Sequence, residues 1–262
     1  MDGATVAHPT STTPDRDPRP TPPRRHISRP AKVLALVCGA LAIVVGLVAL
    51  RRPLFQGNHD VVDPGRVFRS AQPRGDWDRL IDNDHLASVL NLRGGSPSDS
   101  FYADEVDALK RRDIAFFDFS MSAVRRPGRR ELLALLDLFD RCRYPLLIHC
   151  KSGADRTGLA SVLYLMSQRG LAPEQALRAF SIAYGHVSYG GPEHLHEPIE
   201  EYRAWLARNG LSHTPSRFRA WIARDYRSDD PPDEFTPITP GPRVRHRRER
   251  VATQPSAPPV SR

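Results

Sequence analysis

The stretch from Pro145 to Gly158 reads PLLIHCKSGADRTG. It begins with an apolar run, Leu146 to Ile148, which is short enough for a buried strand, and it ends where a helical apolar pattern starts. The residues between them are small or polar and predict a short loop. Backbone N–H groups at the start of a helix are unpaired and carry the positive end of its dipole. The strand, loop and helix together therefore predict a cradle for an anion.

Two side chains of this cradle are candidates for chemical roles. Cys150 follows the predicted strand, where the helix dipole and Arg156 favour a thiolate over a thiol. Arg156 offers a planar fork of donors that suits two phosphate oxygens at once. We therefore predict Cys150 as a nucleophile and Arg156 as a phosphate-binding group. The predicted phosphate-binding residues are Lys151, Ser152, Gly153, Ala154, Asp155 and Arg156.

The pattern His149-Cys150, then five residues, then Arg156-Thr157-Gly158, resembles the signature loop of the cysteine-dependent protein tyrosine and dual-specificity phosphatases. The resemblance implies attack of the cysteine sulfur on phosphorus, a phosphocysteine intermediate and its hydrolysis by water, with no metal or other cofactor. Loop amides and the arginine would stabilise the charge of the transition state. Thr157 is expected to donate its hydroxyl to the Cys150 sulfur, and His149 to hold the loop through a ring N–H.

Two residues are candidates for the group that donates a proton to the leaving group. In the resembled family an Asp on a mobile loop, well before the nucleophile in sequence, supplies this proton. Asp118 is the first candidate, although it falls at the end of a predicted strand and the loop after it contains no carboxylate. Asp155 is the second, because it resembles the Asp at the same place in myotubularin-like and Sac-like lipid phosphatases.

The substrate class also stays open. The resemblance favours phosphotyrosine in proteins, with dual specificity. Lys151 resembles the Lys that follows the nucleophile in the tensin-type phosphatidylinositol phosphatase, which favours phospholipids, phosphoinositides or sugar phosphates. A phosphate-binding module without turnover is the remaining alternative. A cluster of arginines after Asp118 is either a basic rim for an anionic substrate or a solvated face; it contains Arg125, Arg126, Arg129 and Arg130.

The alternation of strand and helix patterns predicts the fold. Strands are expected over residues 87–93, 114–119 and 146–148, and helices over 76–85, 100–112, 130–140, 157–168, 173–184, 197–209 and 216–226. This order predicts an α/β domain over residues 63–228, with a central, mostly parallel sheet flanked by helices and the phosphate-binding loop between a strand and a helix. Residues 66–73 also resemble the start of bacterial phosphatases of this group.

The two ends differ in composition from this domain. Residues 1–32 and 231–262 are rich in proline, the latter also in arginine, and both are predicted to be disordered. Residues 33–50, VLALVCGALAIVVGLVAL, contain no charge and predict a transmembrane anchor, with a cleaved signal peptide as the alternative. More basic residues precede this span than follow it, which favours a catalytic domain outside the cytoplasm.

Composition excludes several other classes of protein. Three cysteines rule out a disulfide framework. The net charge of +8 comes without a nucleic-acid-binding motif, so we expect no nucleic-acid partner. The expected partners are a phosphorylated protein or lipid substrate and a membrane. A zinc site is disfavoured because the later histidines lack cysteine or carboxylate partners at ligand spacing. These histidines are His186, His194, His196 and His213.

Overall fold

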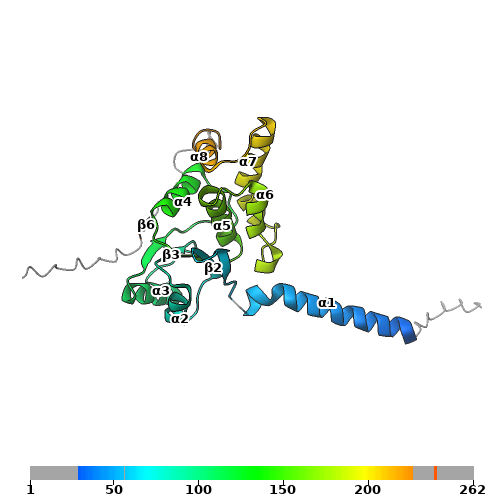
Figure 1. Ribbon diagram of the computed structural model, residues 1–262. Coiled ribbons are helices and arrows are strands. Elements are labelled where there is room, and N and C mark those ends of the chain that lie inside the picture. The colour runs from blue at the N-terminus through cyan, green and yellow to red at the C-terminus, as the bar shows by residue number, and fades with distance from the viewer. Residues whose placement is uncertain (1–28, 56, 227–238, 241–262) are drawn as a thin grey trace, which may run out of the picture. The chain divides into compact units, whose positions relative to one another are not determined.

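The computed structural model describes residues 29–55, 57–226 and 239–240 (Figure 1). The chain divides into two units, residues 1–44 and 45–262. The predicted disordered ends, 1–32 and 231–262, lie mostly outside the described residues. Within them the structure describes the start of a helix at Arg29 and a short strand at 239–240.

Helix α1, Arg29–Phe55, contains the apolar stretch over residues 33–50. Its described apolar side chains are largely exposed, as Val33, Leu36 and Ile43 illustrate. Within residues 29–55, 57–226 and 239–240, no helix combines the length and the apolar character needed to cross a bilayer. The structure therefore does not support the predicted transmembrane anchor, and the extracytoplasmic location of the domain stays a prediction.

A mostly parallel sheet forms the centre of the second unit. Its spatial order is β1-β2-β5-β3-β4-β6, in which β2, β5, β3 and β4 run parallel while β1 and β6 pair antiparallel at the two edges. The strands are β1 Asp60–Asp63, β2 Val67–Ala71, β3 Ser88–Asn91, β4 Ala115–Asp118, β5 Leu146–Cys150 and β6 Thr239–Pro240. This confirms the predicted parallel sheet, in which the sequence did not mark β1 and β2 as strands.

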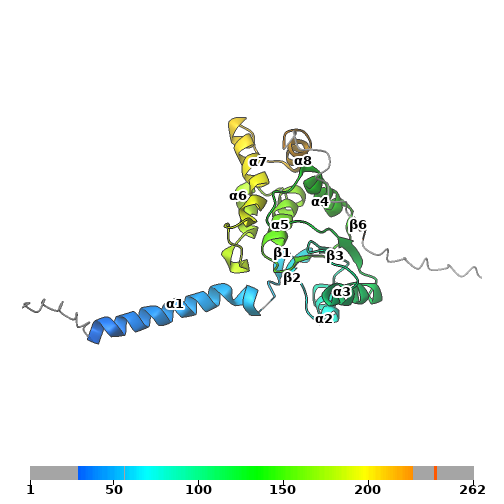
Figure 2. The ribbon, with the colours of Figure 1, turned by 180° about the vertical axis from the view of Figure 1, so that it is seen from behind.

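Helices cover both faces of the sheet, as the two opposite views show (Figures 1 and 2). Successive side chains of a strand point to opposite faces. Along β5, Leu146 and Ile148 join the larger core with α4 (Arg129–Arg141), α5 (Asp155–Gln168) and α8 (Pro215–Arg224). Leu147 joins the smaller core on the other face, with α2 (Trp77–Asp84) and α3 (Ser100–Arg111). The predicted flanking by helices is confirmed.

The helix predicted over residues 173–184 is wrong beyond its first turn. The chain forms α6 (Pro173–Ala176), then the 3-10 turns η1 (Leu177–Ala179) and η2 (Ile182–Tyr184). The hydroxyl of Ser181 accepts from the Ala183 amide, which starts a new turn, and Gly185 ends that turn at φ 76°. After a further turn, η3 (Pro192–Leu195), helix α7 (Glu197–Arg208) leads to α8. The segment from Ala179 to Leu195 is called the strap below.

Helix α8 completes the larger core. Its side chains Phe218 and Ile222 are fully buried, and Trp221 nearly so. Just beyond it, the buried Tyr226 hydroxyl donates to the carbonyl oxygen of Pro127 at 2.6 Å. These contacts fasten the end of the domain to the loop before α4.

A chain that ends before α8, after residue 212, should fail to unfold cooperatively. Full burial of one such side chain contributes about 1.5–3 kcal/mol, and several of them approach the ~5–15 kcal/mol that separates folded from unfolded domains. Thermal unfolding followed by circular dichroism measures this. The control is a chain that ends after residue 226, which should melt as the full chain does. Equal melting of the two shortened chains would contradict the role given to α8.

Candidate active site

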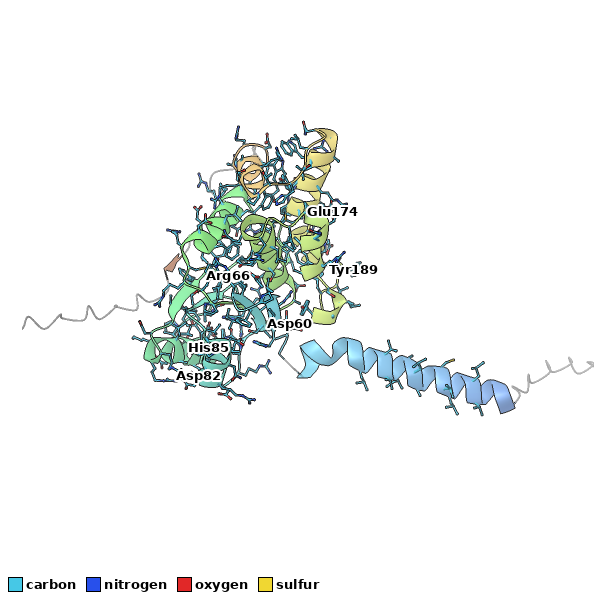
Figure 3. The ribbon with its side chains drawn as sticks, in the orientation of Figure 1. Asp60, Arg66, Asp82, His85, Glu174 and Tyr189 are labelled. Atoms are coloured by element: carbon cyan, nitrogen blue, oxygen red, sulfur yellow. The ribbon has the colours of Figure 1, made fainter. Side chains whose placement is uncertain are left out.

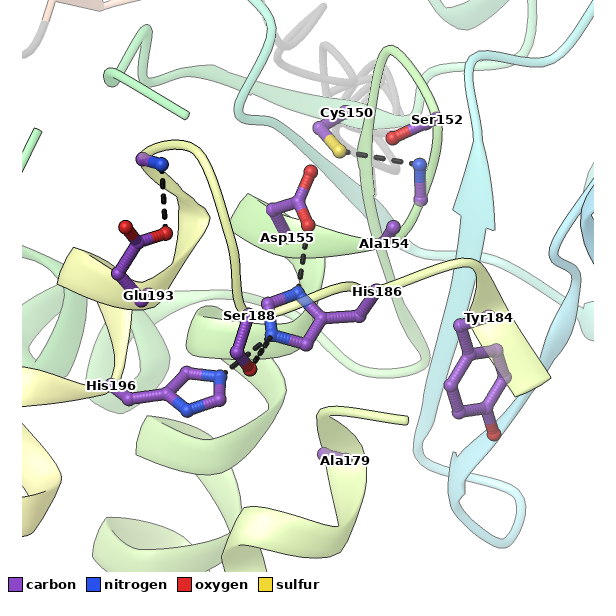
Figure 4. A network of polar contacts seen from close by, with 12 residues as sticks. Cys150, Ser152, Ala154, Asp155, Ala179, Tyr184, His186, Ser188, Glu193 and His196 are labelled. Carbon is purple, nitrogen blue, oxygen red and sulfur yellow. Dashed lines mark hydrogen bonds and ion pairs between the residues drawn. The ribbon is translucent and has the colours of Figure 1, made fainter. Parts of the chain in front are cut away.

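The predicted anion cradle lies where β5 ends and α5 begins. Cys150 is the last residue of β5 and is 1 % exposed. Its sulfur accepts a hydrogen bond from the backbone N–H of Gly153 at 3.2 Å (Figure 4). This bond holds the sulfur at the base of the loop. Ala154 stands at the N-cap of α5 and has no side-chain acceptor, so it leaves the first amides of the helix to an anion.

Gly153 lets the loop lie directly on β2. Its φ is +71°, in the left-handed region, and a Cβ built there would lie 2.5 Å from the Ala71 nitrogen and 2.6 Å from the Ser70 carbonyl oxygen. Only glycine meets both conditions at this place. The loop curvature that turns an amide toward the sulfur therefore depends on the missing side chain.

Arg156 is held beside the loop by two backbone carbonyls. Its Nη1 donates to the Leu92 and Met121 oxygens, each at 3.2 Å. Arg93 lies near Arg156. The pKa of the Arg93 guanidinium is lowered, first by burial and next by the charge of Arg156. Two guanidinium groups thus lie near this end of the sheet, where they favour an anionic ligand.

Arg69, on β2, fastens the loop from behind, and the sequence patterns did not single it out. It is 1 % exposed, and its Nη2 donates to the Gly153 oxygen at 2.7 Å and more weakly to the Ala154 oxygen at 3.4 Å. Its Nη1 donates to the Ala179 oxygen at 2.7 Å. One buried guanidinium therefore ties the phosphate-binding loop to the start of the strap.

A buried polar cluster lies next to the loop around Glu105 of α3. His149 Nε2 lies 2.7 Å from Glu105 Oε1, and both side chains are fully buried. Glu105 Oε2 accepts from Gln72 at 3.0 Å and from Asn91 at 3.3 Å. The observed partner of His149 is thus a carboxylate on α3, which sequence patterns missed because it lies on an ordinary amphipathic helix.

Asp118, the first candidate for the proton donor, belongs to the same buried region. It ends β4, is 9 % exposed, and accepts a hydrogen bond from the Tyr102 hydroxyl at 2.7 Å. Burial raises the pKa of the Asp118 carboxyl, and the Tyr102 bond opposes part of that rise. The Asp118 side chain is therefore buried in the domain and hydrogen-bonded there.

Asp155, the second candidate, lies within the loop itself. Its side chain is 22 % exposed, and its Oδ1 lies 2.7 Å from Nδ1 of His186 on the strap (Figure 4). His186 Nε2 lies in turn 2.7 Å from Nε2 of His196. The sequence had placed these two histidines only in a disfavoured zinc site.

The other two histidines of that zinc hypothesis bind elsewhere. His194 pairs with Glu197 at 2.5 Å, and His213 lies 3.1 Å from the Met166 carbonyl oxygen. In the part of the chain that the structure describes, no group of three or more His, Cys, Asp or Glu side chains is placed to hold a metal ion.

The contact predicted for Thr157 is not made. Thr157 is fully buried at the first turn of α5, and its Oγ1 finds no hydrogen-bond partner among the described residues. The sulfur accepts from the Gly153 amide instead. Lys151 and Ser152 are exposed on the loop, and the Ser152 carbonyl accepts from the side chain of Asn58 at 2.6 Å.

The arginines after Asp118 hold their loop to neighbouring helices. Arg125 pairs with Glu131 at 3.0 Å, and Arg126 pairs with Glu201 at 2.6 Å. Arg129 donates to the Ala223 oxygen at 3.3 Å. These contacts favour a structural role for three members of the predicted cluster.

A loop that carries a cysteine and an arginine six residues apart, between a parallel strand and a helix, is typical of cysteine-dependent phosphatases. In agreement, residues 55–178 match the model of a family described as the tyrosine phosphatase family. The chain therefore carries a domain of the cysteine-dependent tyrosine phosphatase superfamily and is a phosphatase of that kind. The predicted family is confirmed.

Several solved structures are similar to this chain. TpbA from P. aeruginosa is 18 % identical, with 63 % of this chain and 96 % of that chain covered and a TM-score of 0.41. The core of the PP-IP phosphatase SIW14 from S. cerevisiae, in complex with citrate, is 19 % identical over 58 % and 93 %, with a TM-score of 0.44. PTPMT1 in complex with PI(5)P is 18 % identical over 56 % and 97 %, with a TM-score of 0.41.

Replacement of Gly153 by alanine should disrupt the loop. The added Cβ meets the backbone of β2, in addition to the roughly 1–2 kcal/mol cost of a left-handed conformation. We expect phosphatase activity to fall at least about tenfold, the factor for ~1.4 kcal/mol of lost transition-state stabilisation. Gly210→Ala is the control, because its φ is +60° and a Cβ there meets nothing within 4 Å. Equal loss of activity in both variants would contradict the importance of the close approach.

Replacement of Asp118 by asparagine should stabilise the domain increasingly as pH rises. The folded-state pKa lies above the ordinary value of 3.8, so the stability contributed by protonated Asp118 is present at low pH and is lost as pH rises through the folded value. Asparagine stays neutral and still accepts from Tyr102. Melting temperatures of the unmodified protein and of Asp118→Asn are compared between about pH 4 and 7.5. The expected difference in the free energy of unfolding is ~1.4 kcal/mol for each unit by which the pKa is raised.

A matched control for Asp118 carries the opposite sign. Arg112 lowers the pKa of the exposed Asp82 carboxyl, so its contribution to stability is present above the ordinary value and is lost at low pH. Asp82→Asn, measured from about pH 2.5 upward, should therefore lose melting temperature relative to the unmodified protein as pH rises toward the ordinary value of 3.8, and keep that deficit above it. Parallel behaviour of the two variants would contradict the raised pKa of Asp118.

Proposed function

We propose that this protein hydrolyses phosphate monoesters through a phosphocysteine intermediate, with phosphotyrosine in proteins as its leading substrate. The observation that carries the proposal is the buried Cys150 sulfur, which accepts from the Gly153 amide at the N-terminus of a helix beside Arg156. A sulfur held at the base of an anion-binding loop is placed to attack the phosphorus of a bound phosphoryl group. The same loop then binds the phosphoryl oxygens that gain charge in the transition state.

Asp155 is the residue we propose as proton donor. A general acid must reach the leaving-group oxygen, which lies outside the loop opposite the nucleophile. The Asp155 carboxyl is part of the loop and partly exposed, and Figure 4 shows it on the same side of the loop as the Cys150 sulfur. Asp118 is 9 % exposed and bound to Tyr102, which keeps it from the surface.

The reaction then has two balanced steps. In the first, the bond from Cys150 sulfur to phosphorus forms while the bond from phosphorus to the leaving oxygen breaks, and the Asp155 proton passes to that oxygen. In the second, a water oxygen bonds to phosphorus while the phosphorus–sulfur bond breaks, and the water proton returns to Asp155. The products are an alcohol or phenol and inorganic phosphate, with the thiolate restored.

A second substrate class, phosphorylated lipids, is favoured by Lys151. Its side chain is exposed directly after the nucleophile, where an ammonium group suits a substrate with more than one phosphate. Apolar side chains on the strap are also exposed, with Tyr189 at 85 % and Val187 at 57 %. Figure 3 shows Tyr189 at the outer edge of the domain. An aryl ring or an acyl chain suits such a surface.

Phosphate release by the full chain should distinguish these possibilities. The unmodified protein is expected to release phosphate from a phosphotyrosine peptide, and Cys150→Ser is expected to release none. A phosphoinositide in mixed micelles is the parallel substrate, and faster release from it would move the substrate class to lipids. Absence of release from both substrates would leave a phosphate-binding protein without turnover.

Two conservative variants test the proton donor. Asp155→Asn should lower kcat on the phosphotyrosine peptide by about 10²–10⁴, the usual contribution of a general acid. In Asp118→Asn the amide still accepts from Tyr102, and kcat should stay within about tenfold of the value for the unmodified protein. Such a loss is smaller than the contribution of a general acid. The opposite order of the two losses would assign the role to Asp118.

A further inference from the structure

The strap and the residue directly after it bring two histidines, His186 and His196, to the phosphate-binding loop. His186 is 6 % exposed, and its Nδ1 lies 2.7 Å from Oδ1 of Asp155. Its Nε2 lies 2.7 Å from Nε2 of His196 and 3.2 Å from the Ser188 hydroxyl. Figure 4 shows the resulting chain of contacts, which runs from the loop carboxyl through one imidazole to the next. Both ring nitrogens of His186 are therefore used.

Packing fixes the orientation of both rings. The Phe180 ring lies 4.7 Å from the His186 ring and 4.0 Å from the His196 ring, centroid to centroid. A Cβ on Gly158 would lie only 2.8 Å from Phe180, so the absent side chain at this position of α5 admits the phenylalanine. The strap is held at its start by Arg69 and near Tyr184 by Asn58, which donates to the Tyr184 oxygen at 2.8 Å.

The contacts assign the donors and acceptors along the chain. We assign the hydrogen to His186 Nδ1, which then donates to a lone pair of Asp155 Oδ1 both when the carboxyl is ionised and when it carries its proton on Oδ2. With the hydrogen on Nδ1, Nε2 of His186 accepts, and Nε2 of His196 donates to it. Burial lowers the pKa of His196, which agrees with a neutral ring there.

We propose that His186 is a positioning residue of the phosphatase reaction. Its Nδ1–H donates to Oδ1 of Asp155 whether the Asp155 carboxyl is ionised or protonated. The acid proton therefore resides on Oδ2, the oxygen that remains free to face the leaving group. His196 holds His186 in the tautomer that donates. The inference rests on the proposed role of Asp155 as general acid, and it deepens that role by naming what orients the carboxyl.

Loss of the His186 donor should matter most when the leaving group needs a proton. Phenyl phosphate requires protonation of its leaving oxygen, whereas 2,4-dinitrophenyl phosphate releases a phenolate that is stable without it. The measured quantity is the ratio of kcat/KM for the dinitrophenyl ester to that for the phenyl ester. A variant that merely loosens the loop lowers both values together and leaves the ratio unchanged.

The histidine itself offers a matched pair of substitutions. In His186→Asn the amide nitrogen takes the place of Nδ1 and keeps the bond to Asp155. In His186→Gln the amide oxygen takes the place of Nε2, so it still accepts from His196, and the donor to Asp155 is lost. His194→Gln is the control, because His194 lies on the same strap, is partly exposed and pairs with Glu197.

In the full chain, we expect the ratio to rise at least about tenfold in Asp155→Asn and in His186→Gln, since a misplaced catalytic group costs up to ~10². His186→Asn and His194→Gln should stay within about threefold, below ~1 kcal/mol of transition-state energy. Melting temperatures establish that each variant is folded. If His186→Gln does not fold, His186→Asn provides the test. A tenfold rise of the ratio in His186→Asn would overturn the proposal.

Three further results would overturn it in distinguishable ways. An unchanged ratio in folded His186→Gln, together with a raised ratio in Asp155→Asn, would reject His186 as positioning residue and keep Asp155 as the acid. An unchanged ratio in Asp155→Asn would reject the acid and the positioning residue together. Absence of hydrolysis of either ester by the unmodified protein would reject the proposed function itself.

Discussion

The site depends on one buried guanidinium. Arg69 donates to the carbonyls of Gly153 and Ala179, and so joins the phosphate-binding loop to the strap from within β2. The carbonyls of the loop must find donors on its outer side if the loop amides are to face inward, because buried backbone groups are costly when unpaired. A buried arginine with fixed, planar donors meets this requirement, and a lysine, with a single ammonium group on a flexible stem, would not.

Local pattern was sufficient to predict the central strands of the sheet and the loop that begins at Cys150. The apolar run before Cys150 and the helical period after Gly158 fixed a strand and a helix, since both signals lie within a few residues. The helices 76–85, 100–112 and 130–140 were also predicted close to their observed bounds. The strands β1 and β2 were missed, because each is short and carries arginine or aspartate among its apolar residues.

Contacts between distant residues could not be predicted in this way. Glu105 binds His149 from another helix, and its sequence position shows only an acidic residue on an amphipathic helix. His186 had a visible signal, a histidine in a glycine-marked loop, but its partner Asp155 could be identified only once the strap was in place. The same strap explains the failed helix prediction, because tertiary contacts at Ala179 and Phe180 override the local helical propensity.

The absence of a side chain at Gly158 couples two positions that never bond to each other. Phe180 occupies the space that a Cβ at 158 would need, and it is also the surface on which the two histidines rest. During evolution, a larger residue at 158 would be tolerated only with a smaller one at 180, and the histidines would then lose their support. The two positions are therefore expected to vary together among related sequences.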